Sequence, residues 1–107
     1  MTNSRDKGKR GERALAAELC RLGLPARRGQ QFNGLEGEDV ICEALPHWHL
    51  ECKFVERLDL RGAVEQAKTD AGARWWAVCH KRNRGEWLVT LPLQTMARLW
   101  HLDGPPS

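Results

Sequence analysis

The chain has 107 residues, of which 41% are hydrophobic and 29% charged, and its formal net charge is +3. This length fits a single domain spanning residues 1–107, and the composition is ordinary for a soluble globular protein. No apolar run approaches the ~18 residues that a membrane span requires, and no signal-peptide core is evident, so we expect an intracellular, cytoplasmic protein.

The four cysteines are widely spaced and include no C-x-x-C pair; they are Cys20, Cys42, Cys52 and Cys79. This spacing excludes a zinc ribbon and gives no indication of a disulfide framework. We therefore interpret all four as small, buried apolar residues.

Charge is unevenly distributed along the chain. Residues 1–30 carry eight Lys or Arg against three acids, residues 31–73 carry four against nine, and residues 74–107 carry five against two. An acidic middle flanked by basic ends fits a cation site set in a surface that attracts polyanions, although an ordinary mixed surface would show the same counts.

The chain begins with a basic stretch, residues 1–11, which we expect to be a loose arm because Gly8 and Gly11 disfavour helix. A helix is predicted over residues 12–22, where leucines recur at helical spacing before a Gly-Leu-Pro sequence. Glu12 belongs to the apolar stripe of this helix. It is either a carboxylate favoured by the helix dipole or an acid that reaches a cation site.

Three strands and a loop are expected between the first helix and residue 54. Residues 24–31 predict a short strand, and the glycine-containing residues 32–38 predict a loop. Residues 37–43 and 48–54 are two β-type runs joined by a turn that contains Pro46, a pattern that predicts a hairpin.

The second half predicts a helix, a hairpin and a last helix. The first helix covers residues 60–71, with Asp59 as its N-cap and a glycine at its end. Residues 74–80 and 86–91 predict an antiparallel pair around a basic turn, and a helix from Pro92 precedes a loose tail at 102–107.

The order α-β-β-β-α-β-β-α indicates an α/β domain with a mixed central sheet flanked by helices. Five tryptophans are many for so small a domain. We expect them either to pack in the core or to lie partly in a subunit interface, where large aromatic residues concentrate.

The stretch from Gly37 to Lys53 contains the residues best suited to chemistry. Side chains alternate along a strand, so Glu51 and Lys53 share one face while Cys52 lies on the other. If Asp39 on the preceding strand opposes them, two carboxylates and one ammonium converge. Such a group can bind a hard cation and activate a water molecule beside it.

Taken in order, Glu12, Asp39, Glu51-Cys52-Lys53 and Gln66 resemble the PD-(D/E)XK nuclease superfamily. More narrowly, the chain is similar to the archaeal-type Holliday junction resolvases, a branch also found in phages. The similarity covers roughly residues 7–90 and includes the Lys-Gly-Lys-Arg-Gly-Glu-Arg opening (7–13) and the Leu-Gly-Leu-Pro-Ala-Arg-Arg link (22–28). It departs from the family pattern in having Glu38 before the Asp and no serine in residues 29–38.

This resemblance implies a restriction-endonuclease-like fold and a Mg²⁺ cofactor, with Mn²⁺ able to substitute. Asp39, Glu51 and the backbone carbonyl of Cys52 would bind the metal, and Glu12 would join them directly or through water. Lys53 would position the attacking water, and Gln66 would support the site from the following helix. The expected DNA contacts are Arg5, Lys7, Lys9, Arg10, Arg13, Arg27, Arg28, Gln30, Lys81, Arg82 and Arg84.

The implied activity is that of a homodimeric, Mg²⁺-dependent endodeoxyribonuclease that resolves four-way DNA junctions in recombination and repair. A nickase, restriction-like enzyme or flap nuclease of the same superfamily is an alternative. Another is a basic DNA-binding module without catalysis, in which Asp39, Glu51 and Lys53 form a structural ion-pair cluster. A last alternative is a zinc site made by His47, His49 and Glu51.

Overall fold

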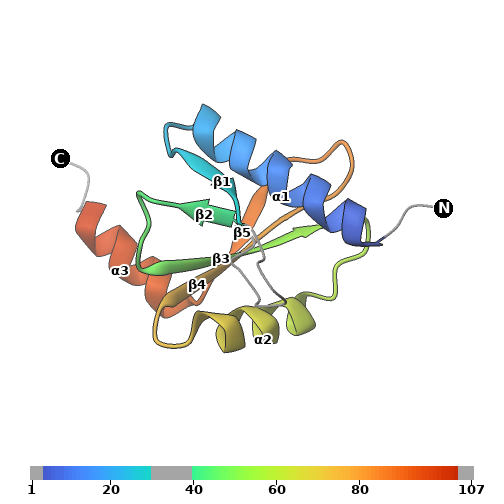
Figure 1. Ribbon diagram of the computed structural model, residues 1–107. Coiled ribbons are helices and arrows are strands. Elements are labelled where there is room, and N and C mark those ends of the chain that lie inside the picture. Colours follow the sequence, from blue (N-terminus) through green and yellow to red (C-terminus); the bar gives the residue numbers. More distant parts are fainter. Residues whose placement is uncertain (1–3, 30–39, 104–107) are drawn as a thin grey trace.

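The computed structural model describes residues 4–29 and 40–103, with the side chains of residues 4–7 and 103 excepted (Figure 1). The elements follow the predicted order, and no helix in these ranges is long and apolar enough to cross a membrane. They are α1 (Ser4–Arg21), β1 (Ala26–Arg28), β2 (Val40–Cys42), β3 (Trp48–Phe54), α2 (Leu60–Ala71), β4 (Trp75–Lys81), β5 (Leu88–Thr90) and α3 (Leu93–Asp103).

A mixed three-stranded sheet lies at the centre, in the order β3-β4-β5. Strands β3 and β4 are parallel, and β4 and β5 form the predicted antiparallel hairpin, in which Cys79 lies opposite Val89. The turn between β4 and β5 closes with a hydrogen bond from the Gly85 backbone N–H to the Arg82 carbonyl, 3.0 Å long. The expectation of an α/β domain with a mixed sheet is therefore confirmed.

The predicted hairpin between residues 37–43 and 48–54 is wrong in its pairing. Within the described residues β2 pairs with β1, antiparallel, whereas β3 pairs with β4. The chain does turn near Pro46, since the Trp48 N–H donates to the Leu45 carbonyl. However, β3 satisfies its backbone over seven residue pairs with β4, and the three-residue β2 offers no ladder of comparable length.

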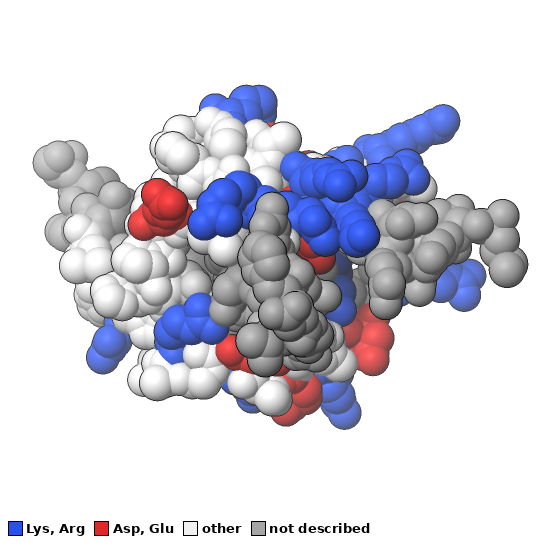
Figure 2. Space-filling view, in the orientation of Figure 1, with Lys and Arg blue, Asp and Glu red and all other residues white. Residues whose placement is uncertain are grey.

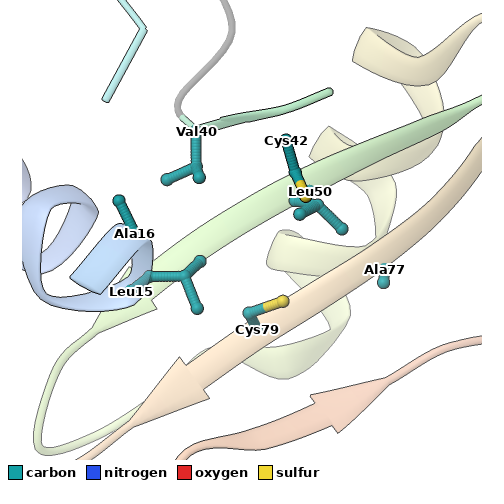
Figure 3. Packing of buried hydrophobic residues seen from close by; sticks show 7 residues of the cluster. All are labelled: Leu15, Ala16, Val40, Cys42, Leu50, Ala77 and Cys79. Carbon is teal, nitrogen blue, oxygen red and sulfur yellow. The ribbon is translucent and has the colours of Figure 1, made fainter. Parts of the chain in front are cut away.

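The two faces of the three-stranded sheet are covered by different helices (Figure 1). On one face Leu50 of β3 and Cys79 of β4 pack against Leu15 of α1 and against the short strand β2 (Figure 3). On the other face Val78 of β4 packs beneath α2 and is fully buried. Alternation along each strand thus places consecutive residues of β3 in two separate environments.

Helix α2 has the boundaries that the sequence predicts. The Asp59 carboxylate caps it by accepting a hydrogen bond from the Gly62 N–H at 3.1 Å, and Gly72 follows its last turn with φ +63°. Ala63, Ala67 and Ala71 are buried against the sheet. Because these side chains are small, the backbone of α2 approaches the sheet closely, and its neighbouring polar residues come within reach of β3.

Helix α1 begins eight residues earlier than predicted, so most of the expected loose arm is helical. The cost of Gly8 and Gly11, about 1 kcal/mol each in a helix, is outweighed by packing. Gly11 is buried where α1 touches β3, and a Cβ there would lie 2.7 Å from the Cβ of Phe54. At the other end α3 extends to Asp103, so residues 102 and 103 are also helical rather than part of a loose tail.

The interpretation of the cysteines holds for two of the four. Cys42 and Cys79 are buried, and burial raises the pKa of the Cys79 thiol to about 12, so this thiol stays protonated in the core. Cys52 is half-buried. Cys20 is exposed, contrary to expectation, because it lies at the last turn of α1 and bonds the backbone of Ala26 rather than the core.

We predict that Gly11→Ala lowers the free energy of unfolding by about 1–3 kcal/mol, because the added methyl group overlaps Phe54 where the side chain is fixed to the strand backbone. Gly8→Ala is the matched control, since nothing lies within 4 Å of its added Cβ. This control should stabilise the protein by about 0.5–1 kcal/mol. Urea unfolding of both variants measures the difference, and equal effects would contradict the close contact.

Candidate functional site

Strand β3 presents a row of three polar side chains, His49, Glu51 and Lys53, to helix α2. The prediction that Glu51 and Lys53 share one face is confirmed, since Glu51 lies in register with Val78, whose side chain packs under α2. The first two residues of the row are buried and the third is partly exposed: His49 is 3% exposed, Glu51 1%, and the Lys53 side chain 29%. The row therefore leads from the interior to the surface.

Glu51 is a buried carboxylate with a partner at each oxygen. Its Oε1 lies 2.9 Å from Nε2 of His49, and its Oε2 lies 3.8 Å from Nζ of Lys53. A charge removed from water is costly unless it is paired and hydrogen-bonded. The residues two positions before and after Glu51 on the same strand face provide these partners.

Helix α2 adds two polar residues one turn apart. Lys53 Nζ donates to Oε1 of Gln66 at 3.1 Å, so Gln66 reaches the β3 row as the sequence suggested it could. The carboxylate of Asp70 approaches His49 and Glu51, and the ligand atoms of these three residues all lie within 4.8 Å of one another. Within residues 4–29 and 40–103, this is the group of His, Cys, Asp or Glu side chains whose spacing suits a metal ion.

Asp70 was not predicted as a site residue. The signal was present, because Asp70 follows Gln66 by four positions and both lie beside the alanine stripe of α2. Spacing alone does not show how far a helix is rotated about its axis over a strand. His47, which the zinc alternative included, lies in the exposed turn before β3, and Asp70 takes its place in the group.

Glu12 contacts a different residue from those expected. Its Oε2 accepts a hydrogen bond from Nε of Arg28 on β1 at 3.0 Å, and both side chains are half-buried. Helix α1 covers the face of β3 that bears Cys52 and Phe54, while Glu51 faces α2. The described contacts thus pair Arg28, an expected phosphate ligand, with the acid that was expected to reach the metal. A metal-binding role of Glu12 stays a prediction.

Asp39 and Gln30 lie outside the described residues, so the convergence of Asp39 with Glu51 also stays a prediction. The neighbouring Val40 begins β2 and is buried in the core. Cys52, whose backbone carbonyl was expected to bind metal, lies on β3 in register with Cys79 of β4. Its role is likewise untested.

Basic side chains gather over α1 (Figure 2). Arg10 and Arg13 on this helix and Arg27 on β1 are exposed, and Lys9 is half-buried. In the β4–β5 turn Arg82 and Arg84 are exposed as well. The adjoining Lys81 is half-buried, with its Nζ 5.2 Å from the centroid of the Phe54 ring, a cation–π contact. For Arg5 and Lys7 the structure describes the helical backbone only.

Comparison with known proteins does not assign the chain to a family or a function. No protein-family model matches the chain, and neither the curated proteins nor the solved structures contain a match. The function must therefore be argued from the site. Carboxylates, an imidazole, an ammonium and an amide meet there between β3 and α2, a set that can bind a cation and contact an anion beside it.

We predict that His49→Ala lowers the free energy of unfolding by about 1–3 kcal/mol, because the buried Glu51 carboxylate loses its closest hydrogen-bond partner. Lys53→Ala should cost less than about 1 kcal/mol, since this ammonium is partly solvated and lies farther from the carboxylate. Chemical denaturation of the two variants measures the order. A larger loss for Lys53→Ala would show that the lysine, rather than the histidine, compensates Glu51.

Proposed function

We propose that this chain is a metal-dependent endodeoxyribonuclease of the PD-(D/E)XK type, with a restriction-endonuclease-like fold. The observation that carries the proposal is the Glu51–Lys53 pair. A buried carboxylate and a partly exposed ammonium lie 3.8 Å apart on one strand face, and Gln66 of the next helix holds the ammonium. The sequence resemblance assigns catalytic roles to the same two residues.

The donors in this region fit a divalent cation. Glu51 and Asp70 bring carboxylate oxygens within 4.8 Å of each other, and Asp39 is the further acid that the resemblance adds. A bound Mg²⁺ would supply charge stabilisation at the phosphate and a more acidic water molecule. Lys53 would orient that water and offset negative charge on the scissile phosphate, while Gln66 would keep the ammonium in place.

Basic residues from distant parts of the chain lie near the end of β3 where Lys53 is partly exposed. Phe54 lies in register with Lys81, so the turn that carries Arg82 and Arg84 begins beside that end. Gly11 of α1 approaches Phe54 closely, which brings the first half of α1 to the same end. A DNA backbone drawn to these basic elements would pass Lys53.

A four-way junction is the substrate that we propose, cut by a homodimer. Such a junction has near two-fold symmetry, and a C2 dimer would present two sites to opposed strands. Helix α3 offers apolar surface for a second copy of the chain: Leu93, Trp100 and Leu102 are 74%, 59% and 81% exposed. In such a dimer Trp100 would be one of the tryptophans in the subunit interface.

The second candidate is a basic DNA-binding module without catalysis. It is favoured by the burial of Glu51 and His49 against each other, which also suits a purely structural pair. The two candidates differ in what Asp39→Ala and Lys53→Ala remove. In an enzyme they remove cleavage, and in a binding module they change stability alone.

We predict that the protein makes paired nicks in a synthetic four-way junction in the presence of Mg²⁺ or Mn²⁺, and cuts linear duplex little. Asp39→Ala and Lys53→Ala should each lower the cleavage rate by at least about a hundred-fold, because they remove a metal ligand and the cation beside the phosphate. Gel assays on junction, flap and linear DNA measure the preference.

Glu65→Gln is the control variant for this assay, because Glu65 is an exposed acid on α2 with a single ion pair to Lys68. Its cleavage rate should equal that of the wild type. Equal cutting of flaps and junctions would favour another nuclease of the same type. No cutting of any DNA with either metal would leave the DNA-binding module as the function.

We further predict that the double variant Arg10→Gln/Arg13→Gln weakens junction binding. The slope of log affinity against log salt concentration should fall by about 0.9 for each phosphate that the protein no longer neutralises. Substitution is preferable to truncation, since removal of residues 1–9 would shorten α1. Arg61→Gln, an exposed arginine on α2, serves as the control. An unchanged salt slope in the double variant would place the DNA elsewhere.

A further inference from the structure

We infer that His49, Glu51 and Asp70 form a binding site for a transition-metal ion of the Zn²⁺ class, with one nitrogen and two carboxylate ligands. This inference goes beyond the proposed nuclease activity, because it holds whether or not the chain cuts DNA. The ligand atoms of the three residues lie within 4.8 Å of one another, and they come from β3 and from the last turns of α2.

The distance between the two strand ligands suits a shared metal. At the tetrahedral angle, bonds of about 2.0–2.2 Å from zinc to imidazole nitrogen and carboxylate oxygen place neighbouring ligand atoms about 3.3–3.6 Å apart. Nε2 of His49 and Oε1 of Glu51 are 2.9 Å apart. An ion could therefore replace the hydrogen bond between them once the two atoms move apart by about 0.5 Å.

The three ligands differ in how firmly the surrounding structure holds them. His49 and Glu51 are almost fully buried, so packing fixes their direction, whereas Asp70 is exposed on α2 and its carboxylate can rotate toward the ion. The ligand atoms are at most 4.8 Å apart, a gap that a rotation of the Asp70 carboxylate would narrow. Two carboxylates also balance the charge of a divalent cation, which lowers the cost of placing it beneath a helix.

The donor types decide which ion is favoured. Mg²⁺ prefers oxygen ligands and keeps several waters, which a pair of buried side chains leaves little room for. Imidazole nitrogen together with carboxylate suits Zn²⁺ and its neighbours, which bind a given nitrogen and oxygen site more tightly. If the nuclease proposal is also correct, Glu51 and Asp70 would be common to both metal sets, and His49 would be the ligand that distinguishes the zinc site.

The competing explanation is that His49 and Glu51 form a purely structural pair. The role of Asp70 distinguishes this explanation from a metal site. The 2.9 Å contact accounts for His49 and Glu51 without any ion, but it gives Asp70 no part. Because Asp70 is exposed, its replacement by asparagine should leave stability nearly unchanged while removing a ligand. Asp70→Asn should thus lower metal affinity without lowering the free energy of unfolding.

The test is isothermal titration calorimetry of the full chain with Zn²⁺ and, separately, with Mg²⁺. We expect one Zn²⁺ per chain, bound at least about ten-fold more tightly than Mg²⁺, and a loss of at least about ten-fold in Zn²⁺ affinity for Asp70→Asn. His49→Gln should give a similar loss. Glu65→Gln, which removes a neighbouring acid on α2, should bind Zn²⁺ as the wild type does.

Cys20→Ala controls for the one thiol that is exposed among the described residues, since a thiolate could also bind zinc. Zn²⁺ binding that survives this change but falls in Asp70→Asn supports the site. Binding abolished in Cys20→Ala, unchanged in Asp70→Asn, or no tighter than that of Mg²⁺ would overturn it. Cleavage is not measured in this test, so its failure leaves the nuclease proposal intact.

Discussion

The buried carboxylate of Glu51 needs polar partners, and this need constrains how β3 and α2 pack together. Glu51 lies between His49 and Lys53 on the same strand face, and an uncompensated charge at this depth would cost several kcal/mol. The alanine stripe of α2 is the counterpart of this arrangement. Larger residues at Ala63 or Ala67 would lift the helix from the sheet, admit water above Glu51 and move Gln66 away from Lys53.

Much of the β3–α2 region could be predicted from patterns within each element of the sequence. Period-two alternation is enough to put Glu51 and Lys53 on one face, and the cap at Asp59 with the glycine at position 72 is enough to bound α2. The β4–β5 hairpin was predictable for the same reason, since a short turn joins two strands that are adjacent in sequence.

What the sequence did not show depends on contacts between distant segments. The partner of β3 is β4, which arrives only after α2 has crossed the sheet, so the nearby β2 was a misleading candidate. Gly11 appeared to weaken α1 because its close approach to Phe54 cannot be seen from spacing. The alanine stripe shows which face of α2 meets the sheet, but it does not show which residues of β3 lie beneath Asp70.

The polar row on β3 also has a direction, and this limits how any ligand could reach it. His49 and Glu51 are closed off beneath α2, while Lys53 is partly open at the strand's C-terminal end. The exposed basic turn of residues 82–84 adjoins the same end. A polyanion would therefore contact Lys53 first, because Lys53 lies between the surface and the buried Glu51. A small cation, attracted by Glu51 and Asp70, could instead enter from the side of α2, where Asp70 is exposed. The cation and the polyanion would then approach Glu51 from different directions.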